Sequence, residues 1–343
     1  MIGVDISDQT IKVVQLSDAK PRRLLAHCIH AVGSGVIVNG VVANKEMMKA
    51  ALQEALVSCR TKSIKKDTVV VSIPETQSFL RVIEMPDMSD DEVDESIRWE
   101  IAQHIPFGVE SVYIDWQALV HSGHGVAKGK REIQAGAAQK KVVDPLYDVM
   151  MELGLDVAAF ELESQAIVRA LISPELHRKQ GVLIVDIGST ATNVIVHDLG
   201  ASRFTASLQQ GVARLATKLA VQDQEKLMQN LHEIPADLLE RITPIMEPEL
   251  DKLVVDIRGV ADFYNSIDAE HRVREVILTG GGSNLLGLDE AFLQHFENIH
   301  IQRGNPWVNI LSSKDSVHPP MNIQESVRYA TALGLALRNV IAL

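Results

Sequence analysis

The sequence predicts an α/β protein of two related lobes with a small α+β module inserted along the way. Three observations carry this prediction: a buried strand-turn-strand stretch at Gly181 to Gly200, a degenerate copy at Val4 to Val14, and a change of texture from about Ser78 to Gly154. The two copies lie 181 residues apart, about half the chain, which favours two lobes over a short-period solenoid. A length of 343 residues agrees with about two domains.

The composition bounds the classes of function. With 46% hydrophobic and 23% charged residues, the chain is typical of soluble globular proteins. A net charge of -12 argues against nucleic acid as the main partner and against nonspecific attraction to anionic lipid. Only two cysteines, Cys28 and Cys59, favour a reducing compartment over a disulfide framework. No run approaches the ~20 apolar residues of a spanning helix and the N-terminus does not resemble a signal peptide, so we expect any membrane role to go through a partner.

The central stretch predicts a phosphate site. Asp186 ends a β-branched run typical of a strand covered on both faces, and Gly188 two residues later allows φ > 0. Amides from Gly188 to Thr190, with the Ser189 and Thr190 hydroxyls, would form an anion-binding nest. Asp186 would repel phosphate, so we expect it to hold Mg²⁺ through water. A plain β-hairpin with an Asx-turn is the alternative for this stretch alone.

The second copy decides between these readings. Val4 to Val14 aligns with Val185 to Ile195, placing Asp5 over Asp186. Two such loops, one per lobe, can face each other across a cleft and grip one polyphosphate from both sides.

The first half then continues through recognisable elements. We expect a strand from Lys12 to Leu16, β-like runs at Arg22 to Val32 and Val36 to Val41, an amphipathic helix from Asn44 to Cys59, and a buried strand from Thr68 to Ile73 stopped by Pro74. In the inserted module we expect a strand at Phe79 to Met85, a helix opened by the capping box Ser89 to Glu92, a hairpin of Tyr113 to His121 with Arg131 to Gln139, and a helix from Pro145 to Leu153. The edge or groove of such a module could accept a peptide.

The second half returns to the sheet by way of a helical subdomain. We expect a strand at Asp156 to Glu161, a helix at Glu163 to Ile172, helices at Gly211 to Ala220 and Gln222 to Leu231, a helix at Glu249 to Ile267 after Pro235, Pro244 and Pro248, a strand at Val273 to Thr279, a helix at Leu285 to Phe296, and a last helix at Gln324 to Leu343. Gly280 to Gly282 would let a flat ring or a ribose approach bare backbone; a tight strand-helix turn is the alternative. Small residues on the Glu163 helix and the last helix predict a hinge between the lobes.

Together these pieces resemble the actin-like ATPase fold, and within it the PilM family of type IV pilus assembly proteins. The resemblance is sharpest at Val69 to Pro74, Met88 to Phe107, Gly154-Leu155, Leu278 to Gly287, Asn305-Pro306 and Ala332 to Arg338. It implies subdomain 1A at 1–77 and 155–178, an inserted subdomain 1C at 78–154 as in FtsA, subdomain 2A at 179–214 and 271–343, and subdomain 2B at 215–270.

The resemblance also implies a function. It describes a cytoplasmic protein, recruited to the inner face of the inner membrane, that binds ATP with Mg²⁺ and grips the N-terminal cytoplasmic tail of a PilN-like bitopic membrane protein between subdomains 1A and 1C. It implies at most a weak ATPase, with no residue assigned to catalysis. The implied nucleotide-binding residues are Asp5, Ser7, Lys12, Asp186, Gly188, Ser189, Thr190, Gly211, Glu225, Gly280, Gly281 and Gly282, with Asp5 and Asp186 holding Mg²⁺ through water.

Two departures from the family pattern keep alternatives open. Ser7-Asp8 replaces the usual Gly-Ser, which puts a negative charge where a phosphate should sit, and the usual lysine three residues after Glu225 is missing. The alternatives are a scaffold of a related secretion system that has lost nucleotide, a filament-forming protein like FtsA, and a kinase or phosphatase of the same superfamily. The last would need a further carboxylate base, and the loops offer no convincing one.

Overall fold

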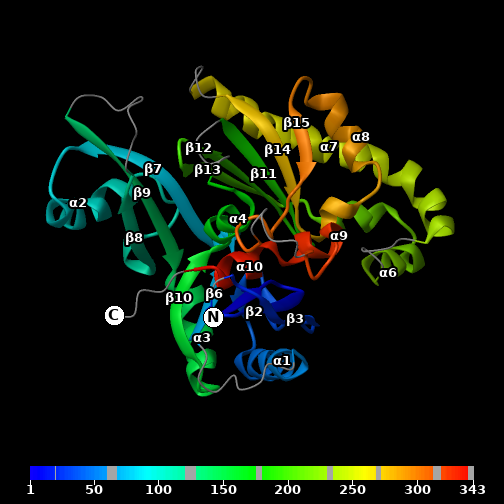
Figure 1. The fold of residues 1–343 in the computed structure, drawn as a ribbon, viewed down its shortest axis with the longest axis horizontal. Helices are drawn as coiled ribbons and strands as arrows, with labels where there is room; N and C mark the ends of the chain where they lie inside the picture. The colour runs from blue at the N-terminus through cyan, green and yellow to red at the C-terminus, as the bar shows by residue number, and fades with distance from the viewer. Residues whose placement is uncertain are drawn as a thin grey trace. The chain divides into compact units, whose positions relative to one another are not determined.

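The computed structural model describes residues 1–19, 21–59, 68–119, 129–174, 180–229, 235–267, 272–311 and 318–338 (Figure 1). The chain forms two compact units. The first comprises Met1–Ile167, Leu199–Thr205 and Thr331–Leu343, and the second comprises Val168–Asp198 and Ala206–Ala330. None of the described helices is both long and apolar enough to cross a bilayer.

A five-stranded sheet forms the centre of the first unit. Its strand order is β10-β6-β1-β2-β3, with bounds Asp156–Leu162, Thr68–Ile73, Ile2–Ile6, Thr10–Leu16 and Leu24–Ala31. β10, β6 and β1 run parallel, whereas β1-β2 and β2-β3 are antiparallel. β1 is buried along its whole length, as its apolar run predicts.

Two helices cover a core on this sheet. α1 (Lys45–Ser58) begins where the Asn44 side chain accepts a hydrogen bond from the Met47 amide, which agrees with the expected helix. α3 (Lys140–Glu152) begins five residues earlier than expected, because Pro145 lies inside the helix rather than at its start. Met48 and Leu52 of α1 share one apolar core with α3 and the sheet.

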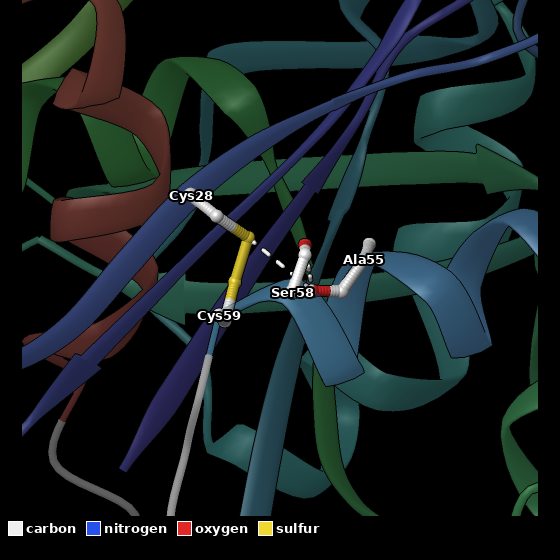
Figure 2. The surroundings of a disulfide bond; sticks show 4 residues. All are labelled: Cys28, Ala55, Ser58 and Cys59. Atoms are coloured by element: carbon white, nitrogen blue, oxygen red, sulfur yellow. Dashed lines mark hydrogen bonds between the residues drawn. A yellow bond between two sulfur atoms is a disulfide. The ribbon is translucent and has the colours of Figure 1, made fainter.

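The two cysteines lie where the edge strand β3 meets the end of α1. Cys28 and Cys59 form a disulfide with Cα atoms 5.2 Å apart, within the usual range (Figure 2). The expectation of two unpaired thiols was therefore wrong, because the two positions, far apart in sequence, meet in the packed sheet-helix layer.

The segment between β6 and β10 contains a three-stranded sheet and a helix, as the sequence predicts, whereas α3, expected as the second helix of the module, packs on the first sheet instead. Its sheet has the order β7-β9-β8 (Ser78–Pro86, Lys130–Gln139, Val112–Ala118), and α2 (Asp90–Ala102) lies beside it (Figure 1). The Ser89 to Glu92 capping box is formed as expected. Val93, Ile97 and Ile101 of α2 pack on Ile133 and its neighbours in the sheet, so the module has a core of its own.

The second unit repeats the plan of the first sheet. The order β15-β14-β11-β12-β13 (His300–Arg303, Val273–Thr279, Gly181–Ile187, Thr192–Asp198, Ala201–Leu208) matches β10-β6-β1-β2-β3, with parallel β15-β14-β11 and antiparallel β11-β12. The pairing registers also match: Asp5 faces Lys12 as Asp186 faces Asn193. The internal repeat is thus confirmed residue for residue.

The helices between β13 and β14 depart from expectation at α7 and after Gly211. α7 (Ala236–Ile267) runs unbroken through Pro244 and Pro248, which we expected to interrupt it. Apolar side chains buried at helical spacing on both sides of the prolines, Leu238, Ile242, Met246, Leu250 and Leu253, offset the cost of about 3 kcal/mol per internal proline. The helix expected after Gly211 is short, with α5 at Val212–Leu215 followed by a 3₁₀ turn, and α6 spans Val221–Gln229.

The β12-β13 hairpin was not predicted. Its two-residue turn consists of Leu199 and Gly200, with φ of 48° and 80°, the positive angles of a type I′ turn. Leucine rarely adopts positive φ, so Gly200 is the only one of the two turn residues that favours this turn.

Two helices contain points where the chain passes from one unit to the other. These are α4 (Glu163–Leu171) and α10 (Ala330–Ala336), the latter preceded by α9 (Ile323–Ser326) and a 3₁₀ turn rather than one continuous helix. Within the first unit, a Cβ on Gly334 would lie 1.8 Å from the Ala166 carbonyl oxygen. The small faces therefore meet as expected, and their role as a hinge stays a prediction.

Candidate functional site

The first loop connects β1 to β2 and is built on a buried carboxylate. Asp5 is 3% exposed; its Oδ2 lies 2.9 Å from Lys12 Nζ, and its Oδ1 accepts from Ser72 Oγ at 3.3 Å. The same Ser72 hydroxyl accepts from the Ile6 amide at 2.9 Å. Asp5 is thus oriented and neutralised before any ligand arrives, because a buried carboxylate needs a cation and hydrogen bonds.

Sequence reasoning missed Ser72. The signal was present, because Val4 pairs with Val71 across the parallel strands and the next residue of each strand reaches the same edge of the sheet. In the repeat, Thr279 stands beside Asp186 in the equivalent place. Each aspartate therefore has a hydroxyl residue on its parallel neighbour.

Ser7 closes the first turn on itself. Its hydroxyl accepts from the Thr10 amide at 3.1 Å and lies 3.0 Å from the Thr10 carbonyl oxygen, and its own amide donates to that oxygen at 2.9 Å. A serine at this position therefore replaces glycine by supplying turn hydrogen bonds. The expected contact of Ser7 with nucleotide stays a prediction.

Asp8, whose negative charge was expected to disfavour phosphate binding, has a structural role. Its two carboxylate oxygens accept from the amides of Asn39 and Gly40 at 2.9 and 2.7 Å. Asn39 and Gly40 have φ of 50° and 77° and form the turn between β4 (Ile37–Val38) and β5 (Val41–Val42). The charge of Asp8 is thus held by backbone donors of a neighbouring hairpin.

The second loop connects β11 to β12. The Gly188 amide donates to the Ala191 carbonyl oxygen at 2.9 Å, and a Cβ at Gly188 would lie 2.9 Å from that oxygen. Gly188 is not among the glycines with positive φ, so it is required for close approach rather than for a left-handed conformation. Its amide is used within the turn, and the predicted role of Ser189 and Thr190 as phosphate donors stays a prediction.

Gly211 packs directly against this loop. A Cβ at Gly211 would lie 2.4 Å from the Ser189 carbonyl oxygen, and the amides of Val212 and Ala213 donate to Gly188 and Ser189 at 3.1 and 2.9 Å. The start of α5 is therefore fastened to the loop.

The glycine triplet lies beside Asp186 in the same unit. Gly280 has φ of 79°, and a Cβ there would lie 2.4 Å from Asp186 Oδ1. Gly282 is packed against Ile187, whereas a Cβ at Gly281 would meet nothing within 4 Å. The triplet begins a 3₁₀ turn (Gly281–Asn284), and α8 (Leu288–His295) starts only after Gly287. Of the three glycines, Gly281 thus presents open backbone where a ring could lie.

The predicted site residues therefore fall into two groups, one in each unit. Asp5, Ser7 and Lys12 lie together in the first unit; Asp186, Gly188, Ser189, Thr190, Gly211, Gly280, Gly281 and Gly282 lie together in the second. Glu225 belongs to α6, and its side chain lies outside the described part of the chain. Lys12 already neutralises Asp5. The expected binding of Mg²⁺ through water at Asp5 and Asp186 stays a prediction.

Comparison with known proteins decides the family. The model of the family described as "Type IV pilus assembly protein PilM" matches residues 3–340. The chain belongs to the PilM family. A structure of a PilM-PilN type IV pilus biogenesis complex matches with a TM-score of 0.79 at 22% identity, covering 99% of this chain and 98% of that one. The ethanolamine utilization protein EutJ from Carboxydothermus hydrogenoformans matches with a TM-score of 0.58 at 15% identity, covering 98% and 88%. The expected actin-like ATPase fold is thereby confirmed.

Proposed function

We propose that this PilM-family chain is an ATP-binding scaffold of a type IV pilus inner-membrane assembly complex. It holds the N-terminal cytoplasmic tail of a PilN-like membrane protein, and that tail recruits it from the cytoplasm to the inner membrane. The repeated loops carry the nucleotide part of the proposal, because both present an aspartate in the same strand register. The similarity to a PilM-PilN complex supports the partner.

In this proposal different residues around the two loops contact different parts of the nucleotide. Lys12 offers a cation to phosphate, Ser189 and Thr190 offer donors, and Gly281 admits the ribose or base. Mg²⁺, when bound, would neutralise polyphosphate charge, and Asp186 would hold its water ligands. Nucleotide then acts as a conformational ligand for the tail-binding groove between the segments 1–77 and 78–154.

A thermal-shift titration tests the nucleotide part. Mg-ATP and Mg-ADP are added at millimolar concentration to the wild type and to Asp186→Ala. At 100 times its dissociation constant a ligand adds about 2.7 kcal/mol of stability, so we expect a clear shift that the variant loses. No shift in the wild type would contradict ATP binding and favour the nucleotide-free scaffold.

A synthetic peptide of the PilN-like tail tests the partner part. Fluorescence anisotropy of the labelled peptide should rise on titration with the protein, and a sequence-scrambled peptide is the control. Equal binding of both peptides would contradict specific recognition of the tail.

A further inference from the structure

β13 is shared between the two units. Leu199–Thr205 groups with the first unit and Ala206 onward with the second, so one strand has a separate set of contacts at each end. The strand spans Ala201–Leu208 in the second sheet (Figure 1). One set of contacts involves the α+β module, and the other involves the second phosphate loop. The proposed function requires these two parts to be coupled.

The first half of β13 is fastened to the α+β module. The Arg203 guanidinium forms an ion pair with Glu132 of β9, with the two side chains only 9% and 19% exposed. The Ser202 carbonyl oxygen accepts from Gln134 Nε2 at 3.0 Å in a buried setting. The guanidinium carbon of Arg81, on β7, lies 5.9 Å from the centre of the Phe204 ring. Shielding from water makes such polar contacts stronger and more specific than exposed ones.

The second half of β13 leads into the second phosphate loop. Ser207 Oγ lies 2.8 Å from Asn193 Oδ1, on the strand that follows the loop. Thr192 Oγ1 donates to the Gln210 carbonyl oxygen at 2.6 Å. Gly211, the next residue, is packed on Ser189. A ligand that fixes Ser189 and Thr190 therefore also fixes the end of β13.

We propose that β13 couples nucleotide binding at the second loop to tail binding at the α+β module, and that the Arg203–Glu132 ion pair carries this coupling. This inference rests on the proposed function. Ser207 lies four positions after Arg203, about 13 Å along an extended strand, so one short run of backbone carries both sets of contacts. Thermodynamic linkage then requires the effect to be reciprocal: the tail tightens ATP by the factor by which ATP tightens the tail.

The test measures this factor. The dissociation constant of the labelled tail peptide is determined without nucleotide and with saturating Mg-ATP. We expect a ratio of about 5-fold or more in the wild type, within the usual range of coupling. In Glu132→Gln and in Arg203→Met the ratio should fall to about 1, while each ligand alone binds within about threefold of wild type. The exchanged pair Arg203→Glu with Glu132→Arg should recover part of the ratio.

A matched control lies in the same three-stranded sheet, on β7. Glu84→Gln breaks the Lys130–Glu84 ion pair, which joins β9 to β7 without involving β13, and should leave the ratio unchanged. Hydrogen exchange gives a second readout: Mg-ATP should protect the amides of Lys130–Gln139 in the wild type and not in Glu132→Gln. If circular dichroism shows that Arg203→Met is unfolded, Gln134→Ala replaces it.

The outcomes separate the two proposals. A wild type that binds the peptide but no nucleotide overturns ATP binding, and the coupling with it. If the wild type binds both peptide and nucleotide but Mg-ATP does not change the dissociation constant of the peptide, only the role of β13 is overturned. The same holds if Glu132→Gln keeps the full ratio of dissociation constants and the protection of β9 amides. A ratio lost equally in Glu84→Gln also overturns it, because general weakening of the module would then be the cause.

Discussion

Lys12 and Asp5 face each other across β1 and β2, with Lys12 Nζ 2.9 Å from Asp5 Oδ2. In the repeat, the position facing Asp186 holds the uncharged Asn193. The two loops are therefore alike in backbone and unlike in charge. The first presents a neutralised carboxylate with a cation beside it, and in the second an asparagine occupies the position of that cation.

Removing this lysine should destabilise the first unit. Lys12→Met leaves Asp5 buried without its cation, and we expect a loss of about 1–3 kcal/mol in urea unfolding, discounted because Lys12 is partly exposed. Adding Asp5→Asn should recover most of the loss. Lys49→Met breaks an exposed pair with Glu152 and should cost about 0–1 kcal/mol. Equal losses of unfolding free energy in the two lysine variants would contradict the inference that the buried Asp5 needs its cation.

Asp8 should matter for stability rather than for nucleotide. Asp8→Ala removes the acceptor of two backbone amides, at Asn39 and Gly40, and should cost about 1–3 kcal/mol in urea unfolding. Asp8→Asn keeps one acceptor oxygen and should lose less. If either variant instead tightened Mg-ATP by tenfold or more in a thermal-shift titration, charge repulsion at the loop would be the better account of Asp8.

Alanine substitutions at two helical glycines should change the stability in opposite directions. Gly334→Ala forces a Cβ to 1.8 Å from the Ala166 carbonyl oxygen and should cost about 3 kcal/mol, the cost of severe overpacking. Gly259→Ala adds a methyl group to open space within α7 and should stabilise by about 0.5–1 kcal/mol. Thermal unfolding of the two variants side by side tests this. A tolerated Gly334→Ala would show that the two helices separate readily.

Much of the fold could be predicted from local pattern. Thr68–Ile73 and Val273–Thr279 have the predicted bounds, because continuous β-branched runs fit strands buried on both faces. The Asp5 and Asp186 copies were found because each aspartate ends such a run. The prediction failed where tertiary packing overrides local preference, as at Pro244 in α7, and where Leu199 adopts a positive φ that leucine rarely adopts.

The proximity of several candidate site residues could also be predicted, and their roles stay predictions. Asp186, Gly280 and Gly211 were each chosen from the sequence and meet in one unit. The roles of Ser72 and Asp8 were not foreseen, because hydrogen bonds between residues far apart in sequence depend on strand register and loop placement. The disulfide escaped prediction for the same reason.

The disulfide should contribute measurably to stability. Closing 31 residues between Cys28 and Cys59 corresponds to about 3–4 kcal/mol in the chain-entropy description. We expect reductant to lower the urea midpoint of the wild type and to leave Cys28→Ser/Cys59→Ser unchanged. Mass spectrometry after alkylation should find both cysteines protected before reduction. Full alkylation of the unreduced, folded protein would contradict the bond.

Glu75 should make stability depend on pH. Burial raises the pKa of this carboxyl above 4.5, and hydroxyl groups of Thr205 and Ser164 oppose the rise only in part. Because the folded state holds this proton more tightly, the contribution of Glu75 to stability is fully present below pH 4.5 and is lost as the pH rises through the folded-state pKa. Glu75→Gln should flatten that slope in urea midpoints measured from pH 4.5 upward. Glu95→Gln, at an exposed position on α2, should not.

The matched register of the two hairpins makes their turns exchangeable parts. Ile6 pairs with Ile11 as Ile187 pairs with Thr192, so the intervening residues are equal in number and enter and leave at the same points of the two sheets. A chimaera carrying the second turn in both places would keep all strand pairing. Such a molecule, and its reciprocal, would assign any difference in ligand selectivity between the halves to a handful of side chains.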